Sequence, residues 1–235
     1  MLLNARYFLK IAHRDGYIRA VNYHSTPINN SAILEEHLRF YSNHYTPVSL
    51  HDLSIFFKEK KWKKRNPGLI ISFDDGYLSN YTVAKPLLEK YGFIGWFFVP
   101  TDRIVVNELK GRDMINWNEL KDLGKRHVVG SHTKTHCRLK GTLTRHKMEE
   151  EIVLSKCMLQ ERLKKEIVVF CWVGGEEWSY SSLAAQIIFE AGYHFSFMTN
   201  SAPITINTSN LQLQRTNIES SWPLEDVKLS LSLMP

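Results

Sequence analysis

The sequence predicts an α/β fold in which helices surround a parallel sheet, and two observations carry this prediction. Short, almost continuously apolar runs alternate with longer stretches of helical period along the 235 residues. No internal repeat, low-complexity tract or linker interrupts the alternation. We therefore expect a single domain over residues 1–235, with its core between about residues 20 and 218.

Seven apolar runs have the length and composition of strands. They are Ala20–His24, Leu69–Phe73, Ile94–Val99, His127–Ser131, Ile167–Trp172, His194–Met198 and Leu211–Arg215. Most of these runs are apolar at nearly every position, which is typical of parallel strands that are buried on both faces. Parallel strands need long crossover connections, so helices should lie between the runs.

Amphipathic stretches between the runs predict those helices. They are Ser31–Tyr45, Ser79–Tyr91, Trp117–Arg126, Thr144–Lys165, Ser179–Gly192 and Trp222–Met234. Pro86 predicts a kink or a short first turn in the second helix, because proline cannot continue the hydrogen-bond ladder. Gly192 stands where a C-cap is expected, and Pro223 with the acids after it favours a helix start.

Charge, apolar runs and cysteines narrow the class of protein. Thirty Lys and Arg against 24 Asp and Glu give a net charge of +6, a moderate preference for acidic partners. No apolar run approaches the roughly 18–20 residues that span a bilayer, and the first 25 residues contain no secretory signal. We expect a cytoplasmic protein.

Cys137, Cys157 and Cys171 match neither a disulfide framework nor a zinc ribbon and should be reduced.

One marked charge run, Lys58–Arg65, precedes the second predicted strand. Its simplest interpretation is a solvated helix end and loop. The alternative is a contact with phosphate on a lipid-linked or nucleotide-linked substrate, or peripheral contact with a membrane, for which Trp62 could supply an apolar foothold. Aromatic residues are too sparse in the run to predict binding of nucleic acid.

Two adjacent carboxylates, Asp74 and Asp75, stand directly after the second predicted strand. Burying an unpaired charge is costly, and a metal ion is the usual compensation for a pair of carboxylates. Gly76 would let the backbone turn sharply enough for both side chains to face one cavity. Taken alone, this segment also fits a β-turn on the surface.

Two histidines, His132 and His136, follow the fourth predicted strand at a spacing that brings both within reach of one ion. Alone, they also fit a solvated pair on the surface. The carboxylates and the histidines both follow predicted parallel strands, at the edge where βα folds build their sites. Two histidines and one carboxylate leave coordination positions open, which indicates a catalytic metal site. The second carboxylate could then take a proton from water.

These segments resemble the motifs of the polysaccharide deacetylases with a NodB-homology domain, also called carbohydrate esterase family four. The motif S/T-F-D-D-G is present as Ser72–Gly76, and H-S/T-x-x-H is present as His132–His136. The resemblance covers roughly residues 20–218 and implies a distorted (β/α)7 barrel, in agreement with the seven predicted strands. It also implies that Asp74 is a general base and that Asp75, His132 and His136 hold zinc, or alternatively cobalt or nickel.

Two further segments resemble parts of the family. Val21–His24 resembles the YH-bearing first strand of permuted members, which assigns His24 to protonate the leaving amine; a core histidine at a strand end is the alternative. Phe170–Gly175 looks like the family's F-x-Y-P-x-G loop, with Trp172 in place of Tyr and Val173 in place of Pro. By analogy, the backbone N–H of Gly174 would stabilise an oxyanion.

Three more residues have two interpretations each. Arg215 stands where related sequences often carry an arginine near the last strand, so it could pair with Asp74 and keep it ionised, or it could be a surface arginine. Trp172 and Trp178 could offer faces on which a sugar stacks, although packing is the commoner use of tryptophan.

The resemblance implies a metal-dependent N-deacetylase that releases acetate from an N-acetylated amino sugar in a polysaccharide, a lipid-linked glycan or a nucleotide sugar. The missing secretory signal favours an intracellular, phosphate-bearing substrate. One alternative is a carbohydrate-binding pseudoenzyme whose altered loop at residues 170–175 no longer supports chemistry. Another is a metal-dependent hydrolase of an O-acetyl ester or a different amide, because attack on a carbonyl is common to these reactions.

Overall fold

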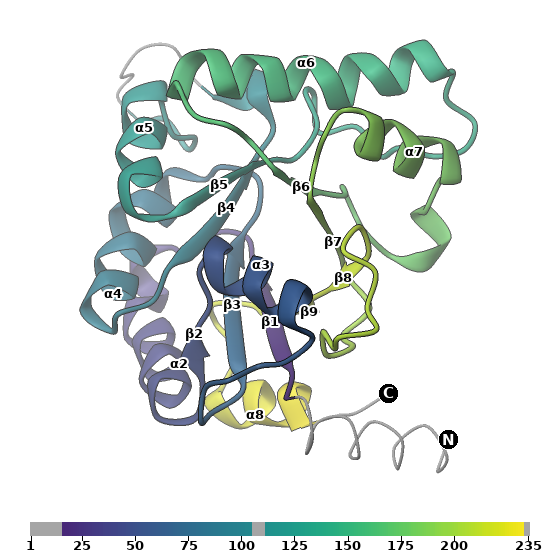
Figure 1. The fold of residues 1–235 in the computed structure, drawn as a ribbon. Helices are drawn as coiled ribbons and strands as arrows, with labels where there is room; N and C mark the ends of the chain where they lie inside the picture. The colour runs from purple at the N-terminus through teal and green to yellow at the C-terminus, as the bar shows by residue number, and fades with distance from the viewer. Residues whose placement is uncertain (1–15, 105–110, 233–235) are drawn as a thin grey trace.

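A computed structural model describes residues 16–104 and 111–232, in which one sheet curls into a nearly closed barrel surrounded by helices (Figure 1). The strands are β1 Ile18–Tyr23, β2 Thr46–Pro47, β3 Gly68–Phe73, β4 Gly95–Val99, β5 Val128–Ser131, β6 Val169–Cys171, β7 Phe195–Met198, β8 Leu213–Gln214 and β9 Thr216–Asn217. Their order is β8-β7-β6-β5-β4-β3-β1-β9, with β2 added beside β3. Every pairing between these strands is parallel, as predicted.

The barrel closes through one short segment that is interrupted at Arg215. Before this residue, β8 pairs with β7, and after it, β9 pairs with β1. Together β8 and β9 therefore act as the last strand of the barrel. Counted this way, and with β2 outside the ring, the described residues give seven strand positions, and the predicted distorted (β/α)7 barrel is confirmed.

Helices cover the outside of the barrel, apart from α3 (Leu50–Glu59), which lies at one end. The others are α2 Ser31–His44, α4 Lys85–Lys90, α5 Trp117–Arg126, α6 Arg145–Leu163, α7 Ser182–Glu190 and α8 Leu224–Ser232. A π-helical turn, Asn80–Ala84, precedes α4 and leaves Pro86 in its first turn, where proline is tolerated. Gly192 follows α7 with a φ of 77°, as its place after a helix predicted. The predicted last helix ends at Ser232; residues 233–235 lie outside the described part.

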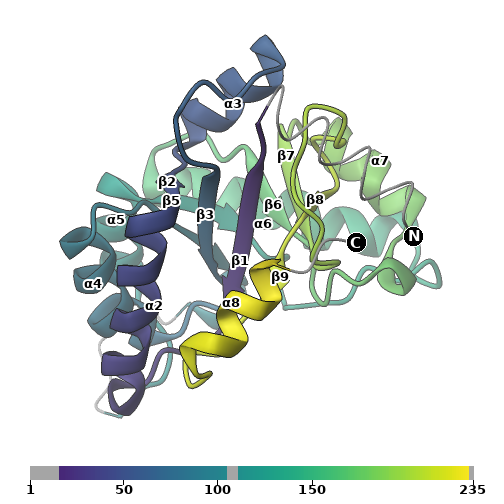
Figure 2. The same cartoon turned by 90° about the horizontal axis from the view of Figure 1, so that it is seen from below.

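The sequence pattern did not predict α3, which closes one end of the barrel (Figure 2). Ser49 begins it with a capping box, in which its hydroxyl accepts from the Asp52 N–H and the Asp52 carboxylate accepts from the Ser49 N–H. The apolar face of α3, with Leu53 and Phe56, packs into the core inside the barrel. The sequence predicts a helix end at the charge run Lys58–Arg65, and α3 is the helix that ends there.

Two apolar cores lie on the two sides of the sheet, because successive side chains of a strand point to opposite faces. Ile70 and Trp96 belong to the core inside the barrel, whereas Ile71 and Phe97 pack outwards against the helices. The same alternation turns polar side chains such as Ser72 inwards near the carboxyl ends of the strands. None of the helices in residues 16–104 and 111–232 is long and apolar enough to cross a membrane.

Candidate active site

The turn after β3 sends two neighbouring carboxylates in different directions. The Asp74 N–H donates to the carbonyl of Tyr23 at 3.0 Å, which extends the pairing of β3 with β1 by one residue. Asp75 then adopts a φ of 72° and Gly76 a φ of 76°. A left-handed backbone is costly for an aspartate and is typical of functional sites. As a result, Asp74 faces the barrel interior and Asp75 faces the loop after β5.

Arg215 holds Asp74 with two parallel hydrogen bonds, of 2.8 Å to Oδ1 and 2.9 Å to Oδ2. The guanidinium also donates to Asn22, Ser72 and Cys171, and Arg215 is only 1% exposed. Burial raises the pKa of Asp74, but Arg215 and then His132 outweigh burial and bring the pKa to about 2. The predicted pairing of Arg215 with Asp74 is confirmed, and the alternative of a surface arginine is wrong.

Asp75, His132 and His136 bring one ligand atom each within 4.8 Å of one another. His132 Nδ1 lies 2.9 Å from the carbonyl oxygen of Cys171, and its Nε2 lies 3.9 Å from Asp75 Oδ1. His136 Nε2 lies 2.8 Å from the same oxygen. Burial lowers the pKa of His132, which favours the neutral imidazole that a metal needs. The three side chains predicted as metal ligands are thus brought together.

The buried Oδ1 of Asp75 supports a cation at this point. Although it lies close to His136 Nε2, it makes no aligned hydrogen bond within residues 16–104 and 111–232. His136 Nε2 and the Arg103 guanidinium lie against this oxygen without such a bond, and a divalent ion between Asp75, His132 and His136 would bind it directly. Carboxylate and imidazole donors also suit zinc and similar ions. The residues present therefore fit the metal that the motifs imply.

A second group, Asp74, His132 and Cys171, also lies within 4.8 Å. Both oxygens of Asp74, however, are already bound by Arg215. Burial raises the pKa of the Cys171 thiol well above its ordinary value, whereas a metal binds the thiolate. The set with Asp75 and His136 is therefore the better metal site, and Asp74 remains available as a base.

Glu151 of α6 fixes the loop that carries the two histidines, and the sequence pattern did not single it out. Its carboxylate accepts from the N–H groups of Lys134 at 3.1 Å and Thr135 at 2.8 Å, and from the Thr135 hydroxyl at 2.8 Å. Its side chain is fully buried. Within this loop, Thr133 and His136 have φ values of 68° and 67°. Glu151 thus stabilises a loop conformation that non-glycine residues rarely adopt.

Arg103 also reaches the site without having been predicted. Its guanidinium donates to His136 Nδ1 at 2.9 Å and lies 3.2 Å from Asp75 Oδ1. Arg103 ends the short 3-10 turn Thr101–Arg103 after β4. The N–H of Asp102 in this turn donates to the carbonyl of Lys134 at 2.9 Å, which ties the turn to the histidine loop. Arg103 reaches the ligands through this contact between distant segments, so no local sequence pattern predicts its position.

Residues 61–196, more than half of the chain, match the family model described as polysaccharide deacetylase. The chain belongs to the polysaccharide deacetylase family. It is 23% identical over 203 residues to YxkH of Bacillus subtilis (strain 168), provisionally named a polysaccharide deacetylase, and the match covers 83% of this chain and 69% of YxkH.

Solved structures of deacetylases share the fold. The Streptococcus pyogenes deacetylase PplD, solved in complex with acetate, matches with a TM-score of 0.79 and 18% identity over 92% of this chain and 99% of PplD. A de-N-acetylase from Aggregatibacter actinomycetemcomitans matches with a TM-score of 0.74 and 15% identity over 91% of this chain and 99% of its own. At these identities, the structural matches support the barrel fold alone.

His24 of this polysaccharide deacetylase lies close to Asp74. The register pairs Tyr23 of β1 with Phe73 of β3, so His24 and Asp74 leave their strands at the same level. His24 is half-buried. Its charge lowers the pKa of Asp74, although by less than Arg215 and His132 do. This position at the barrel mouth is compatible with the predicted role as an acid.

The loop after β6 differs from what its sequence predicted. Cys171 faces the barrel interior, so the alternation of the strand turns Trp172 outwards into the helix layer. Trp172 is 1% exposed, and its indole N–H donates to Ser196 Oγ at 2.7 Å. The prediction that Trp172 offers a sugar-stacking face is therefore wrong. Gly174 has a φ of 83°, a left-handed conformation that favours glycine in this turn.

Trp178 keeps the exposed face that Trp172 lacks. Its side chain is 66% exposed on the loop before α7, and the Arg138 guanidinium lies 5.1 Å from its ring centroid. Arg138 stands two residues after His136 on the histidine loop. Trp178 thus presents a flat apolar surface on the rim of the barrel mouth.

The basic run Lys58–Arg65 lies at the other end of the barrel. It leads from α3 into the start of β3 at Gly68, whereas Asp74 follows the end of β3, about 20 Å away at 3.3 Å per residue. A phosphate in contact with this run would therefore lie about 20 Å from a substrate group held beside Asp74, and the phosphate contact stays a prediction. Trp62 is 8% exposed and donates its indole N–H to the Asn66 carbonyl, so it offers no apolar foothold.

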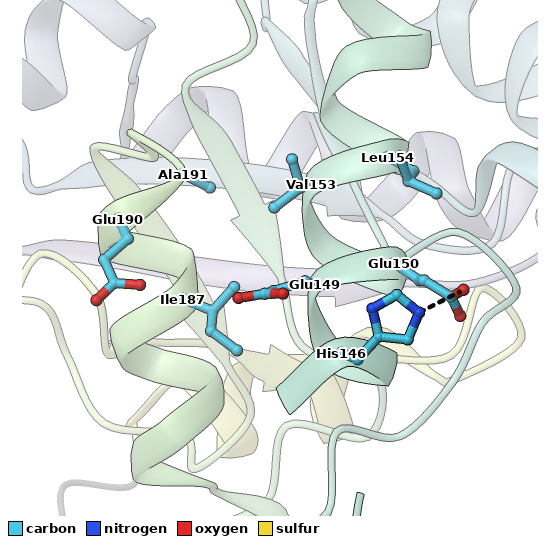
Figure 3. Close-up of a pocket in the computed structure, with 8 residues that line it drawn as sticks. All are labelled: His146, Glu149, Glu150, Val153, Leu154, Ile187, Glu190 and Ala191. Atoms are coloured by element: carbon cyan, nitrogen blue, oxygen red, sulfur yellow. Dashed lines mark ion pairs between the residues drawn. The ribbon is translucent and has the colours of Figure 1, made fainter. Parts of the chain in front are cut away.

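A shallow groove between α6 and α7 lies outside the barrel (Figure 3). Its lining combines apolar residues such as Val153 and Ile187 with Glu149, Glu150 and Glu190. Arg145 pairs with both Glu149 and Glu190, and His146 lies 3.5 Å from Glu150. The lining includes none of the predicted site residues, and the acidic groups already have basic partners. The candidate active site is the barrel mouth.

Proposed function

We propose that this family member is a metal-dependent N-deacetylase that hydrolyses the acetamide of an N-acetylated amino sugar and releases acetate. One observation carries the proposal: the carboxylate of Asp74, held by Arg215, lies beside the candidate metal ligands Asp75, His132 and His136. A base next to a ligand set with free positions is the arrangement that hydrolysis of an amide requires. Membership of the polysaccharide deacetylase family supports the same reaction.

The residues divide the reaction between them. A divalent ion on Asp75, His132 and His136, zinc in the first place and cobalt or nickel as alternatives, would polarise the acetamide carbonyl and make water more acidic. Asp74 removes a proton from the attacking water, and Arg215 keeps Asp74 ionised at any working pH. Oxygen adds to the carbonyl carbon and the C–N bond breaks. His24 gives a proton to the leaving amine, and the Gly174 N–H stabilises the oxyanion.

We also propose that residues 1–235 form one domain of the permuted type. In support, β1, which precedes His24, pairs with β3 along six residues, and so inserts the N-terminal strand beside the Asp74 motif. Arg19 of this strand donates to the carbonyls of Ser230 and Leu231 at the end of α8. Segments from both ends of the chain therefore pack on the same barrel.

Metal content and acetate release test the proposal together. We expect one zinc per wild-type chain by mass spectrometry, retained in Asp74→Asn and lost in Asp75→Ala. Asp74→Asn should lower acetate release from N-acetylated oligosaccharides by at least about 100-fold, the usual contribution of a general base. Unimpaired turnover in Asp74→Asn would overturn the role of Asp74. Faster acetate release from O-acetyl than from N-acetyl sugars would establish the esterase alternative instead.

A further inference from the structure

The two histidines of the ligand set differ in the ring nitrogen that carries hydrogen. His132 Nδ1 faces the Cys171 carbonyl at 2.9 Å, and because a carbonyl only accepts, Nδ1 must carry the hydrogen. The lone pair of His132 Nε2 is then free. Metal-binding histidines are usually oriented in this way by a partner of their second nitrogen. His132 is therefore already in the form that binds a metal through Nε2.

Arg103 sets His136 in the opposite form. An arginine only donates, and its guanidinium lies 2.9 Å from His136 Nδ1, so Nδ1 has to accept. The hydrogen of the neutral ring then sits on Nε2, the atom that lies 2.8 Å from Asp75 Oδ1. A nitrogen that carries hydrogen has no lone pair to give to a metal. His136 cannot be a ligand while Arg103 keeps this contact.

We infer that the Arg103 guanidinium takes the place of a metal ion beside His136 and Asp75, and that it must leave both residues before a metal ion binds. The inference rests on the metal site of the proposed function. The same guanidinium faces two of the three ligands, since it also lies 3.2 Å from Asp75 Oδ1. It occupies a position where its charge repels an incoming divalent ion. Arg103 thus lowers the metal affinity that Asp75, His132 and His136 would otherwise have.

The structure gives Arg103 room to leave. Its side chain is 35% exposed, whereas its backbone turn is held against the histidine loop by the Asp102 N–H and by an ion pair of Asp102 with Lys134. The side chain can therefore move into solvent while the turn stays in place. On release, the hydrogen of His136 passes from Nε2 to Nδ1 through solvent. The ring stays neutral, so this exchange neither takes up nor releases a proton.

Zinc titration against a competing chelator tests the inference with Arg103→Met, which keeps the length of the side chain and removes its charge and donors. We expect Arg103→Met to bind zinc at least tenfold more tightly than the wild-type protein. Arg145→Met is the matched control, because Arg145 loses the same charge on α6 and pairs with Glu149 and Glu190 instead of the ligands. Its zinc affinity should equal that of the wild-type protein.

Nitrogen NMR of ¹⁵N-histidine-labelled protein provides a second readout that does not depend on activity. In the metal-free wild-type protein, His136 should carry hydrogen on Nε2 and His132 on Nδ1. Saturation with zinc should move the His136 hydrogen to Nδ1, and Arg103→Met should weaken the Nε2 preference before zinc is added. If Arg103→Met fails to fold, Arg103→Ala, which also removes the charge and the donors, should still show an affinity above wild type.

The outcomes separate this inference from the proposed function. If neither the wild-type protein nor Arg103→Met binds zinc, the metal site itself is wrong. If both bind zinc with equal affinity, and metal-free His136 already carries hydrogen on Nδ1, the metal site stands and the role of Arg103 is overturned. Weaker binding by Arg103→Met would mean that Arg103 supports the ligands, which also contradicts the inference.

Discussion

Two arginine–carboxylate pairs stand side by side in this barrel mouth, and they are built differently. Arg215 and Asp74 are 1% and 3% exposed and share two hydrogen bonds. Arg103 is partly exposed, lies 3.2 Å from one oxygen of Asp75, and divides its guanidinium between that oxygen and His136. Although Asp74 and Asp75 are adjacent in sequence, only Asp74 has its oxygens fully occupied by its arginine.

Burial explains why the two pairs have different uses. Removing one partner of a buried pair leaves an uncompensated charge and costs about 3–5 kcal/mol. Asp75 is buried as well, but Arg103 is 35% exposed and solvent can replace it, so removing Arg103 costs less. The Arg215–Asp74 pair is therefore permanent and keeps Asp74 in its ionised form. The Arg103–Asp75 pair is weak enough to exchange its cation for a metal ion. Both carboxylates are buried, so the pairs differ in the exposure of the arginine and in how the arginine divides its donors.

The largest expected effect comes from Arg215→Met. This change leaves Asp74 buried and unpaired, so urea denaturation should show a loss of about 3–5 kcal/mol in the free energy of unfolding. Acetate release should fall at least about 100-fold, because Asp74 loses both its charge stabilisation and its orientation. Arg103→Met, measured alongside, should cost less than Arg215→Met, because Arg103 is partly exposed and His136 still lies against Asp75. Equal losses of stability in the two variants would break the comparison.

Strand alternation and motif spacing explain how much of this arrangement the sequence predicts. The seven strands were placed within a few residues, and the motifs located Asp74, Asp75 and both histidines. The inward–outward alternation of strand side chains also predicts the directions of Asp74 and Trp172. Asp74 lies an even number of residues after Ile70 and faces inwards, while Trp172 lies one residue after the inward-facing Cys171 and must face outwards.

The remaining parts of the site depend on contacts between distant segments. Arg103 lies 33 residues before His136, and Glu151 reaches back from the middle of α6 to Thr135. Nothing near either residue in the sequence distinguishes it from a solvated side chain. Their positions follow from how the turn after β4 and the helix α6 pack against one loop. A single sequence without its relatives does not contain this information.

A second prediction concerns Glu151, which supports the loop that carries His132 and His136. Glu151→Ala removes the carboxylate that accepts from the N–H groups of Lys134 and Thr135 and leaves both groups without that acceptor. The loop should lose its conformation, and zinc affinity should fall about 10- to 100-fold, as for other groups that orient metal ligands. The Arg215–Asp74 pair lies elsewhere and should keep its stability. Zinc affinity as high as wild type would show that the loop needs no such support.

Glu151 also makes a pH prediction. Burial raises its pKa, but the hydrogen bonds from Thr135 and the charge of Lys147 outweigh burial, so its folded-state pKa lies below the ordinary value of 4.5. Its contribution is therefore fully present above pH 4.5 and is lost as the pH falls through the folded-state pKa. Urea denaturation from pH 7 downwards should show a smaller loss of stability on acidification in Glu151→Gln than in the wild-type protein.

A smaller effect is expected at Trp178, on the exposed side of the mouth. An aromatic contact of this kind contributes about 0.5–1.5 kcal/mol, so Trp178→Ala should raise the KM for an N-acetylated oligosaccharide about two- to tenfold. Phe189→Ala is the matched control, since Phe189 is 69% exposed on α7 and stands outside the proposed site. Equal KM values for wild type and Trp178→Ala would exclude Trp178 from the substrate site.

The smallest effect should come from the basic run Lys58–Arg65, which tests the distance over which a charge affects the site. Lys58, Lys61 and Arg65 are exposed at the amino ends of the strands, about 20 Å from Asp74, roughly twice the screening length at physiological ionic strength. Changing all three to glutamine should leave KM within about twofold for substrates with and without phosphate. A KM rise confined to the phosphate-bearing substrate, and abolished by high salt, would instead show that the substrate extends around the barrel. Without such a rise, only cations in direct contact with the carboxylates, Arg215 and Arg103, control this site.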